Sequence, residues 1–189
     1  YVDDICIATS DEKLRKRVLT HLKKKFRLKH FDEAKRYVGL QLEWTHNSVK
    51  VHQKDYINKI LDIFKMSECN SVEYPAEEGV KFSKKDPVSK DRIPRYRQMV
   101  GCLLYLLGSR PDVASAIRRC SQYAAVAADK HWRAGKQILR YLAGTKDFGV
   151  TYTRSDDYNL TAYCDSDYGS EEGRKSITGH VIYAQGGPV

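Results

Sequence analysis

Two adjacent carboxylates, Asp3 and Asp4, are the residues of this 189-residue sequence best suited to metal chemistry. They follow Tyr1 and Val2 and precede the apolar stretch 5–8, for which an extended conformation is expected. Because neighbouring side chains of a strand point to opposite faces, both carboxylates approach one ion only at a bend between strands. Such oxygen ligands suit Mg²⁺ and two-metal phosphodiester chemistry. For an Asp-Asp pair alone, an acidic turn facing solvent is the more frequent explanation.

A second acidic site is predicted near the other end of the chain. Residues 160–169 are typical of a strand that ends in carboxylates, at Asp165 and Asp167, and residues 173–183 indicate a turn and a second, alternating strand. An edge hairpin with a solvated acidic loop is the alternative to a metal site. The intervening segment lacks the Gly-x4-Gly-Lys-Ser/Thr spacing of a phosphate-binding loop, which excludes that motif.

Composition favours a polyanionic partner. Lys and Arg outnumber Asp and Glu by 33 to 24, which gives a formal net charge of +9. This excess favours nucleic acid over a membrane surface, although charge bears on association and not on fold. The longest apolar run, residues 102–107, is too short to span a bilayer, and no targeting signal is recognisable. The five cysteines lack a Cys-x-x-Cys pair and are expected to be buried thiols in a reducing compartment: Cys6, Cys69, Cys102, Cys120 and Cys164.

Residues 11 to about 27 are predicted to form an amphipathic helix. Apolar side chains recur every four residues from Leu14 to Phe26, and Ser10 is a suitable N-cap. The opposite face carries eight basic side chains: Lys13, Arg15, Lys16, Arg17, Lys23, Lys24, Lys25 and Arg27. A charge run of this kind is usually a solvated helix face, and contact with a nucleic-acid backbone is the alternative.

A β-hairpin is predicted next. Alternating apolar residues at 37–44 and 49–52 flank the polar break 45–48. Gly39 is expected inside the first strand, where the absence of a side chain lets another backbone approach closely. Trp44 is expected to fill the core.

A second amphipathic helix is predicted at residues 54–66. Residues 67–93 show no periodicity and mix acidic, basic and proline residues. A stretch of this length inside a domain indicates a flexible or surface-draped connection.

Three further helices are predicted up to residue 144. The first begins at Pro94 and is apolar on nearly all sides, which favours burial. The second follows Asp112, and the third begins at the cap Asp129 and ends at Gly144. The polar face of the third helix is another surface that phosphates could contact, and it carries Lys130, Arg133, Lys136 and Arg140.

These motifs together resemble one family. The Tyr-x-Asp-Asp sequence followed by Ile-x-Ile at residues 1–7 resembles the palm-domain metal motif of reverse transcriptases. An Asp at a strand end followed by Arg-Lys-Ser-x-Thr-Gly at 174–179 is similar to the opening of a ribonuclease H domain. A succession of motifs looks like the Pol polyprotein of copia-type LTR retrotransposons. In chain order these motifs are Glu33-Ala34-Lys35, Gln53-Lys54-x-Tyr56-Ile57, Tyr105-x4-Arg110-Pro111-Asp112, His131-Trp132, and Ile138-Leu139-Arg140-Tyr141-Leu142-x-Gly144-Thr145.

The resemblance covers essentially the whole chain and implies an α+β fold. It implies part of a palm and thumb, a helical connection, and the first strands of a ribonuclease H-like sheet. The implied divisions are the C-terminal part of the palm with a primer-grip-like hairpin at 1–53, a thumb helix and irregular linker at 54–93, the helical connection at 94–154, and truncated ribonuclease H-like strands at 155–189.

The resemblance also implies roles for individual residues. Asp3 and Asp4 would hold Mg²⁺ or Mn²⁺ ions for nucleotidyl transfer at the primer 3′-hydroxyl. Asp165 would be the first metal-binding carboxylate of the nuclease, and Asp167 is a further candidate ligand. The implied primer and template contacts are Tyr1, Val2, Gly39 and Leu40.

By resemblance, the activity is that of an RNA-directed DNA polymerase with ribonuclease H. Its partners would be an RNA template, a DNA primer, the RNA–DNA hybrid, deoxynucleoside triphosphates and the rest of the Pol polyprotein, with no membrane. Its location would be a cytoplasmic virus-like particle with nuclear entry, and not outside the cell. The other palm and nuclease carboxylates and the fingers are expected outside residues 1–189, so this polypeptide alone is expected neither to polymerise nor to cleave. A decayed retroelement remnant and a non-catalytic basic nucleic-acid-binding protein are the alternatives.

Overall fold

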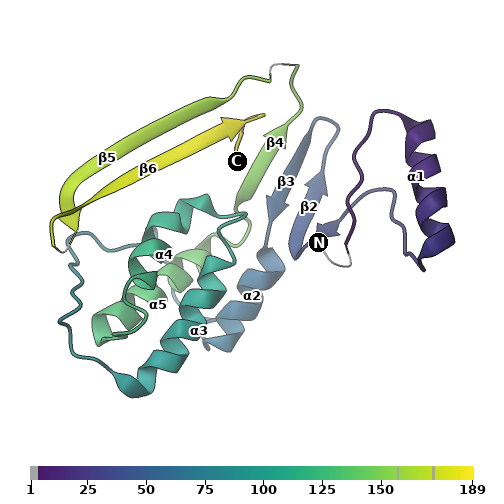
Figure 1. Ribbon diagram of the computed structural model, residues 1–189. Helices are drawn as coiled ribbons and strands as arrows, with labels where there is room; N and C mark the ends of the chain where they lie inside the picture. Colours follow the sequence, from purple (N-terminus) through teal and green to yellow (C-terminus); the bar gives the residue numbers. More distant parts are fainter. Residues whose placement is uncertain (1–3, 157, 172) are drawn as a thin grey trace.

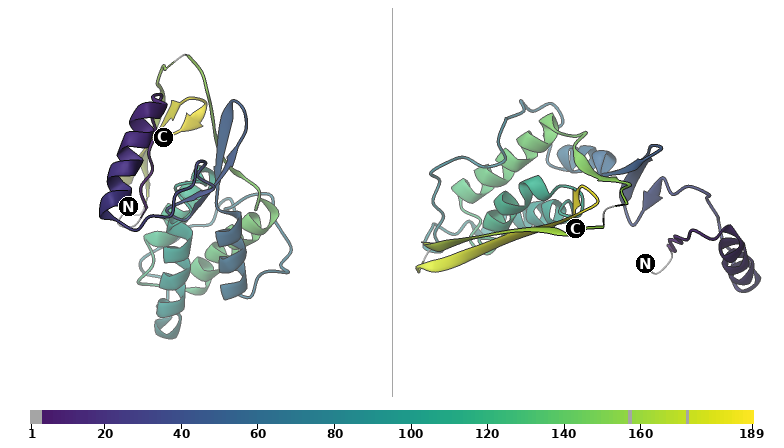
Figure 2. Two further views of the ribbon diagram at one scale, coloured as in Figure 1. Left: turned by 90° about the vertical axis from the view of Figure 1, so that its right-hand side faces the viewer. Right: turned by 90° about the horizontal axis from the view of Figure 1, so that it is seen from above.

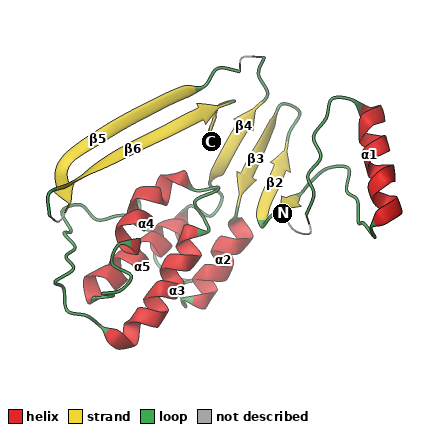
Figure 3. Cartoon of the chain, in the orientation of Figure 1, coloured by secondary structure: helices red, strands yellow, loops and turns green. Residues whose placement is uncertain are grey.

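The computed structural model describes residues 4–156, 158–171 and 173–189. Helices and strands are mixed, which confirms the α+β expectation. Four helices, α2 (Lys54–Ile63), α3 (Ile93–Leu104), α4 (Ala114–Ser121) and α5 (Asp129–Gly144), pack together, and two antiparallel sheets lie beside them (Figure 1; Figure 3). Short 3₁₀ turns, Lys90–Arg92 and Pro111–Val113, lead into α3 and α4.

The apolar core lies between α2, α3, α4 and α5. Ile57, Ile60 and Leu61 of α2 sit at the three- and four-residue spacing of one helix face and are fully buried. Complete burial of each such side chain stabilises the fold by about 1.5–3 kcal/mol. On α5, Ile138, Leu139 and Leu142 are buried in the same core. The helix that begins at Pro94 is buried on one side only, because Leu104 and Tyr105 at its end are exposed.

The first sheet joins the predicted hairpin to the end of the helical region. Its order is β1 (Arg36–Tyr37), β2 (Leu40–Trp44), β3 (Ser48–His52) and β4 (Gly149–Thr153), all antiparallel. The hairpin of β2 and β3 confirms the sequence prediction, whereas β4 was not predicted. A side chain at Gly149 would overlap with the backbone of Val51, so glycine is needed where β4 meets β3.

The second sheet is a long hairpin, as predicted for this region. β5 (Thr161–Glu171) pairs with β6 (Lys175–Ala184), and β7 (Gly187–Pro188) pairs with the end of β6. The hairpin runs above the helices in Figure 1. It is attached to the first sheet through Tyr152 of β4, whose Oη donates a hydrogen bond of 2.7 Å to the carbonyl of Pro188.

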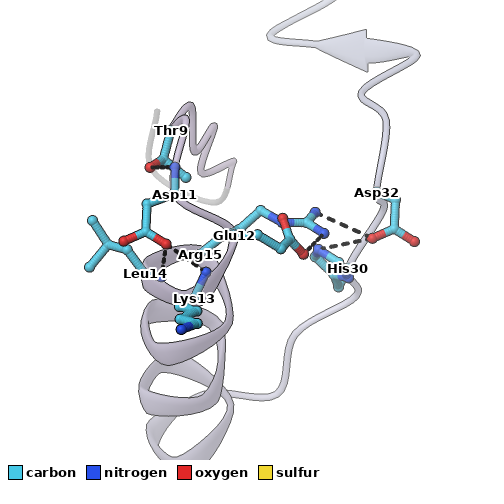
Figure 4. Close-up of polar contacts among 8 residues, drawn as sticks. All are labelled: Thr9, Asp11, Glu12, Lys13, Leu14, Arg15, His30 and Asp32. Carbon is cyan, nitrogen blue, oxygen red and sulfur yellow. Dashed lines mark hydrogen bonds and ion pairs between the residues drawn. The ribbon is translucent and has the colours of Figure 1, made fainter.

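The helix α1 (Glu12–Lys25) stands apart from the helical core (Figure 2). Its N-cap is Asp11 and not Ser10, because Asp11 is the last extended residue and its carboxylate accepts hydrogen bonds from the backbone of Lys13 and Leu14 (Figure 4). None of its residues is buried, and Leu14 on the apolar face is 45% exposed.

The predicted surface-draped connection is confirmed between α2 and α3. Residues 67–89 contain no helix or strand, and their carbonyl groups accept hydrogen bonds from side chains of α4 and α5. Arg140 Nε donates to the carbonyl of Asn70 at 2.8 Å, and Lys130 Nζ donates to that of Lys81 at 2.8 Å. Lys130 and Arg140 therefore hold this connection, and contact of phosphates with the polar face of α5 stays a prediction.

Three smaller expectations are wrong. Trp44 is 48% exposed and not a core residue, because its indole Nε1 donates to the carbonyl of Ala34 at the sheet edge. Of the five cysteines, Cys120 is buried and Cys69 and Cys102 are half-buried, whereas Cys6, in an irregular segment, and Cys164, on β5, are exposed. Asp129 is the first residue of α5, and Ala128 occupies its N-cap position.

In the described part of the chain, no helix is long and apolar enough to cross a membrane.

Candidate functional site

Only part of the predicted acidic motif falls within the structure. Tyr1, Val2 and Asp3 lie outside the described residues, and Asp4 is exposed in an irregular segment. Among the residues that the structure describes, no strand pairs with residues 5–8, so this segment is not part of either sheet.

The predicted primer-contacting residues Gly39 and Leu40 lie at a tight turn. Tyr37 pairs with Leu40, so only Val38 and Gly39 join β1 to β2, and their φ angles are +43° and +82°. The expectation that Gly39 lies inside a strand is wrong, because β1 ends at Tyr37 and β2 begins at Leu40. Leu40 begins β2 and is half-buried.

Tyr105, which follows α3, contacts this turn. Its Oη donates a hydrogen bond of 2.9 Å to the carbonyl of Val38. Its ring packs edge-on against Tyr56 of α2, with 4.8 Å between the ring centres. Sequence reasoning named Tyr105 only as part of the family pattern and missed its contact with the turn, because the apolar run around it indicates core packing.

Other contacts attach the hairpin to α2. The side-chain carbonyl of Gln41 in β2 accepts a hydrogen bond of 2.9 Å from the backbone of Asp55, which is one of the free N–H groups at the start of α2. The Asp55 carboxylate forms an ion pair with Arg36 of β1. At the N-cap position of α2, Gln53 Oε1 accepts a hydrogen bond of 2.8 Å from the buried Ser109 Oγ. The hairpin and the helical core are thus held in one relative orientation.

The buried guanidinium of Arg110 contacts several residues of the motifs that resemble copia-type Pol. Arg110 is fully buried and donates from Nε and Nη2 to the two carboxylate oxygens of Asp112, at 2.9 and 2.7 Å. It also donates to Thr145, and Tyr141 donates to Asp112. Burial raises the pKa of Asp112, but the hydrogen bonds and charge of Arg110 and the hydrogen bond from Tyr141 together outweigh burial and hold this pKa below its ordinary value. These residues hold the end of α5 against the start of α4, so their role is structural.

Asp165 and Asp167 lie on β5, two residues apart and therefore on the same face of the strand. They pair with Gly179 and Ile177 of β6, and both are exposed. Asp165 Oδ1 accepts a hydrogen bond of 2.8 Å from the backbone of Ser166.

Carboxylate oxygens are the ligand type that Mg²⁺ prefers. Within residues 4–156, 158–171 and 173–189, however, no three His, Cys, Asp or Glu side chains gather into a group that could hold a metal ion. The described residues therefore do not form a metal centre by themselves, although Asp165 and Asp167 supply two ligands of the appropriate kind on one face.

A basic surface lies on α1. Arg15 pairs with Glu12 at 2.7 Å and with Asp32 at 3.4 Å (Figure 4). The other basic side chains of this helix and its end are exposed, namely Lys13, Lys16, Arg17, Lys23, Lys24, Lys25 and Arg27. Exposed cations along one helix are the arrangement that phosphate backbones bind without sequence preference.

Similarity to known proteins covers the chain from end to end. Residues 1–78 match the family model described as reverse transcriptase (RNA-dependent DNA polymerase). The whole chain is 32% identical over 190 residues to the retrovirus-related Pol polyprotein from transposon RE2 of Arabidopsis thaliana, and 31% identical over 190 residues to that from transposon RE1. It is 32% identical over 200 residues to the corresponding polyprotein from transposon TNT 1-94 of Nicotiana tabacum. The chain spans 13% of the RE2 and RE1 polyproteins and 15% of the TNT 1-94 polyprotein. No solved structure matches it.

Proposed function

Because the chain belongs to the Pol polyproteins of copia-type retrotransposons, we propose that it forms part of an RNA-directed DNA polymerase with ribonuclease H. The observation that carries the proposal is the match of residues 1–78 to the reverse-transcriptase model, with Tyr-x-Asp-Asp at its start. The attached β2–β3 hairpin supports it, since an element held in one orientation can present a fixed surface to a primer strand.

Asp3 and Asp4 are the proposed metal ligands of the polymerase, for Mg²⁺ or Mn²⁺. A divalent ion at this position would supply charge stabilisation for nucleotidyl transfer. In this proposal Tyr1 and Val2 lie beside the primer terminus. Adjacent carboxylates of this kind need further oxygen ligands, from water, nucleotide phosphates or other parts of Pol.

Asp165 and Asp167 are proposed as carboxylates of the nuclease. Their common face on β5 and their exposure support the proposal, because a metal ion that binds a nucleic-acid strand must be reachable from solvent. Their role in the proposal is to hold a divalent ion near the RNA strand of the hybrid.

The division into palm at 1–53, thumb and linker at 54–93, connection at 94–154 and nuclease strands at 155–189 remains a proposal. The first sheet crosses this division: β4 belongs to the proposed segment 94–154, yet it pairs with β3 of the proposed palm part. The first sheet thus includes strands from both segments, which would make the palm part and the connection move together.

The proposed partners follow from the activity. They are an RNA template, a DNA primer, their hybrid, deoxynucleoside triphosphates and the remainder of Pol. Contacts with phosphates dominate such binding and weaken steeply with salt. The proposed location is a cytoplasmic virus-like particle with access to the nucleus.

The test is primer extension by a Pol protein that contains this chain. With Mg²⁺, an RNA template and a DNA primer, we expect deoxynucleotide incorporation and cleavage of the template strand in the hybrid. Asp165→Asn should abolish cleavage and leave extension intact. If the wild-type protein gives neither activity, the polymerase proposal is wrong.

A non-catalytic nucleic-acid-binding protein is the second candidate. The exposed basic side chains of α1 favour it, because they need no metal to bind phosphates. Binding that persists in a metal chelator, together with no incorporation by the Pol protein, would support this candidate and would also fit a decayed retroelement.

A further inference from the structure

The turn that joins β1 to β2 is strained. Both of its residues have positive φ, +43° at Val38 and +82° at Gly39. Two-residue hairpins of this shape usually contain Asn-Gly, because a β-branched side chain such as that of Val38 is rarely found at positive φ. Strained residues of this kind persist only where surrounding groups hold them, and they are concentrated at functional sites.

Tyr105 is the group that holds this turn. Its hydroxyl donates to the carbonyl of Val38 at 2.9 Å and occupies the space next to Gly39. A Cβ at position 39 would overlap with Tyr105 Oη and would lie only 3.1 Å from Cζ. The contact therefore requires both a glycine at 39 and a chain segment that brings the phenol of Tyr105 to it.

Tyr105 is in turn fixed by the helical core. It directly follows α3, and its ring packs edge-on against Tyr56 of α2. The Tyr56 hydroxyl donates to the carbonyl of Cys102 in α3 at 3.2 Å. Two helices thus set the position of the phenol, and the phenol sets the turn in front of β2.

We propose that Tyr105 is a positioning residue, which holds the Val38–Gly39 turn and the adjoining Leu40 in the conformation that contacts the primer strand. The proposal rests on the proposed polymerase function. It predicts that Tyr105 acts on primer binding and not on nucleotide chemistry, since its hydroxyl holds the turn.

The test compares Tyr105→Phe with wild type in a Pol protein that contains this chain. The substitution removes one hydroxyl and retains the ring that packs on Tyr56. We expect KM for primer–template to rise about two- to fivefold with kcat nearly unchanged, because one half-exposed hydrogen bond is lost. Tyr96→Phe is the matched control, since it deletes the same atom from a buried tyrosine of α3 that donates to Cys120 at 2.9 Å. It should lower the melting temperature and leave KM unchanged.

The possible outcomes separate this proposal from the polymerase assignment. If wild type extends primers and Tyr105→Phe has the KM of wild type, the positioning role is wrong and the polymerase assignment remains. If wild type extends no primer, the polymerase assignment fails and the positioning role fails with it.

A second measurement tests the contact without catalysis. In the 189-residue chain, Gly39→Ala should lower the melting temperature more when residue 105 is Tyr than when it is Phe, because part of the overlap disappears with the hydroxyl. Effects that simply add in the double variant would show that the two residues do not meet, and would overturn the proposal.

Discussion

Arg110 and Asp112 form a two-point ion pair in which the guanidinium is completely buried and the carboxylate is one-third exposed. Because both oxygens of Asp112 are engaged, loss of its charge leaves a cation without a counter-ion in the interior. A buried charge that loses its partner destabilises a protein far more than an exposed one does.

We therefore expect Asp112→Asn to lower the free energy of unfolding by about 2 kcal/mol, less than for a fully buried pair because Asp112 is partly exposed. Urea unfolding of the 189-residue chain measures this change. Glu12→Gln is the matched control, since it removes the same charge from the exposed pair with Arg15, and it should leave stability nearly unchanged. Equal effects of the two substitutions would contradict a structural role for Arg110.

The pH dependence of stability should report on His131. Burial lowers the pKa of this imidazole below its ordinary value, although Asp86, 3.2 Å from Nε2, acts in the opposite direction. As pH falls through about 6.5, the unfolded chain therefore takes up this proton before the folded chain does, and stability decreases from pH 7 to pH 5.

Urea unfolding at pH 7, 6 and 5 tests this expectation. His131→Phe keeps a ring between Phe82 and Tyr123 and should reduce the dependence. Asp86→Asn should steepen it, since the imidazolium loses its counter-charge. A His131→Phe variant with the slope of wild type would rule out this histidine as the source.

The strain at Val38 leads to a stabilising substitution. Val38→Asn places at φ +43° a residue that tolerates positive φ, and should raise the free energy of unfolding by about 1 kcal/mol. Val49→Asn is the control, because Val49 lies in the regular strand β3 between Trp44 and Tyr152, where the same change should destabilise. If Val38→Asn destabilises as well, the turn is not strained.

The basic surface of α1 should contribute to nucleic-acid binding through phosphates alone. Replacing Lys23, Lys24 and Lys25 with Ala should weaken binding to RNA and DNA duplexes alike. The slope of the logarithm of the binding constant against the logarithm of the salt concentration should become shallower by about two to three, because fewer counterions are released. The control replaces three exposed lysines of the segment before α3 with Ala, namely Lys84, Lys85 and Lys90, and changes the charge by the same amount. Fluorescence anisotropy at several salt concentrations gives both slopes, and identical slopes would remove α1 from the interface.

Local periodicity was sufficient to predict much of this fold. The helices α1, α2 and α5 and both hairpins follow from spacing and turn residues, because a single segment determines each of them. Strand β4 was missed because five residues after a helix carry little signal until β3 provides a partner. The positive φ of Val38 was equally hidden, since Tyr105, which holds that turn, lies far along the chain.

The candidate site was predictable only as a motif. Asp165 and Asp167 were predicted where a strand ends, whereas β5 continues past them to Glu171. Tyr105 and Arg110 depend on contacts across the fold, so sequence reasoning named them as part of a family pattern without their physical roles.

The acidic motif provides the most direct test of the proposed polymerase. In a Pol protein that contains this chain, Asp3→Asn and Asp4→Asn should each reduce Mg²⁺-dependent primer extension by at least about a thousandfold. Asp11→Asn, which only alters the cap of α1, should retain nearly full activity. Extension by the Asp3 and Asp4 variants at the rate of wild type would contradict the assignment of these carboxylates, and with it the central claim about the chain.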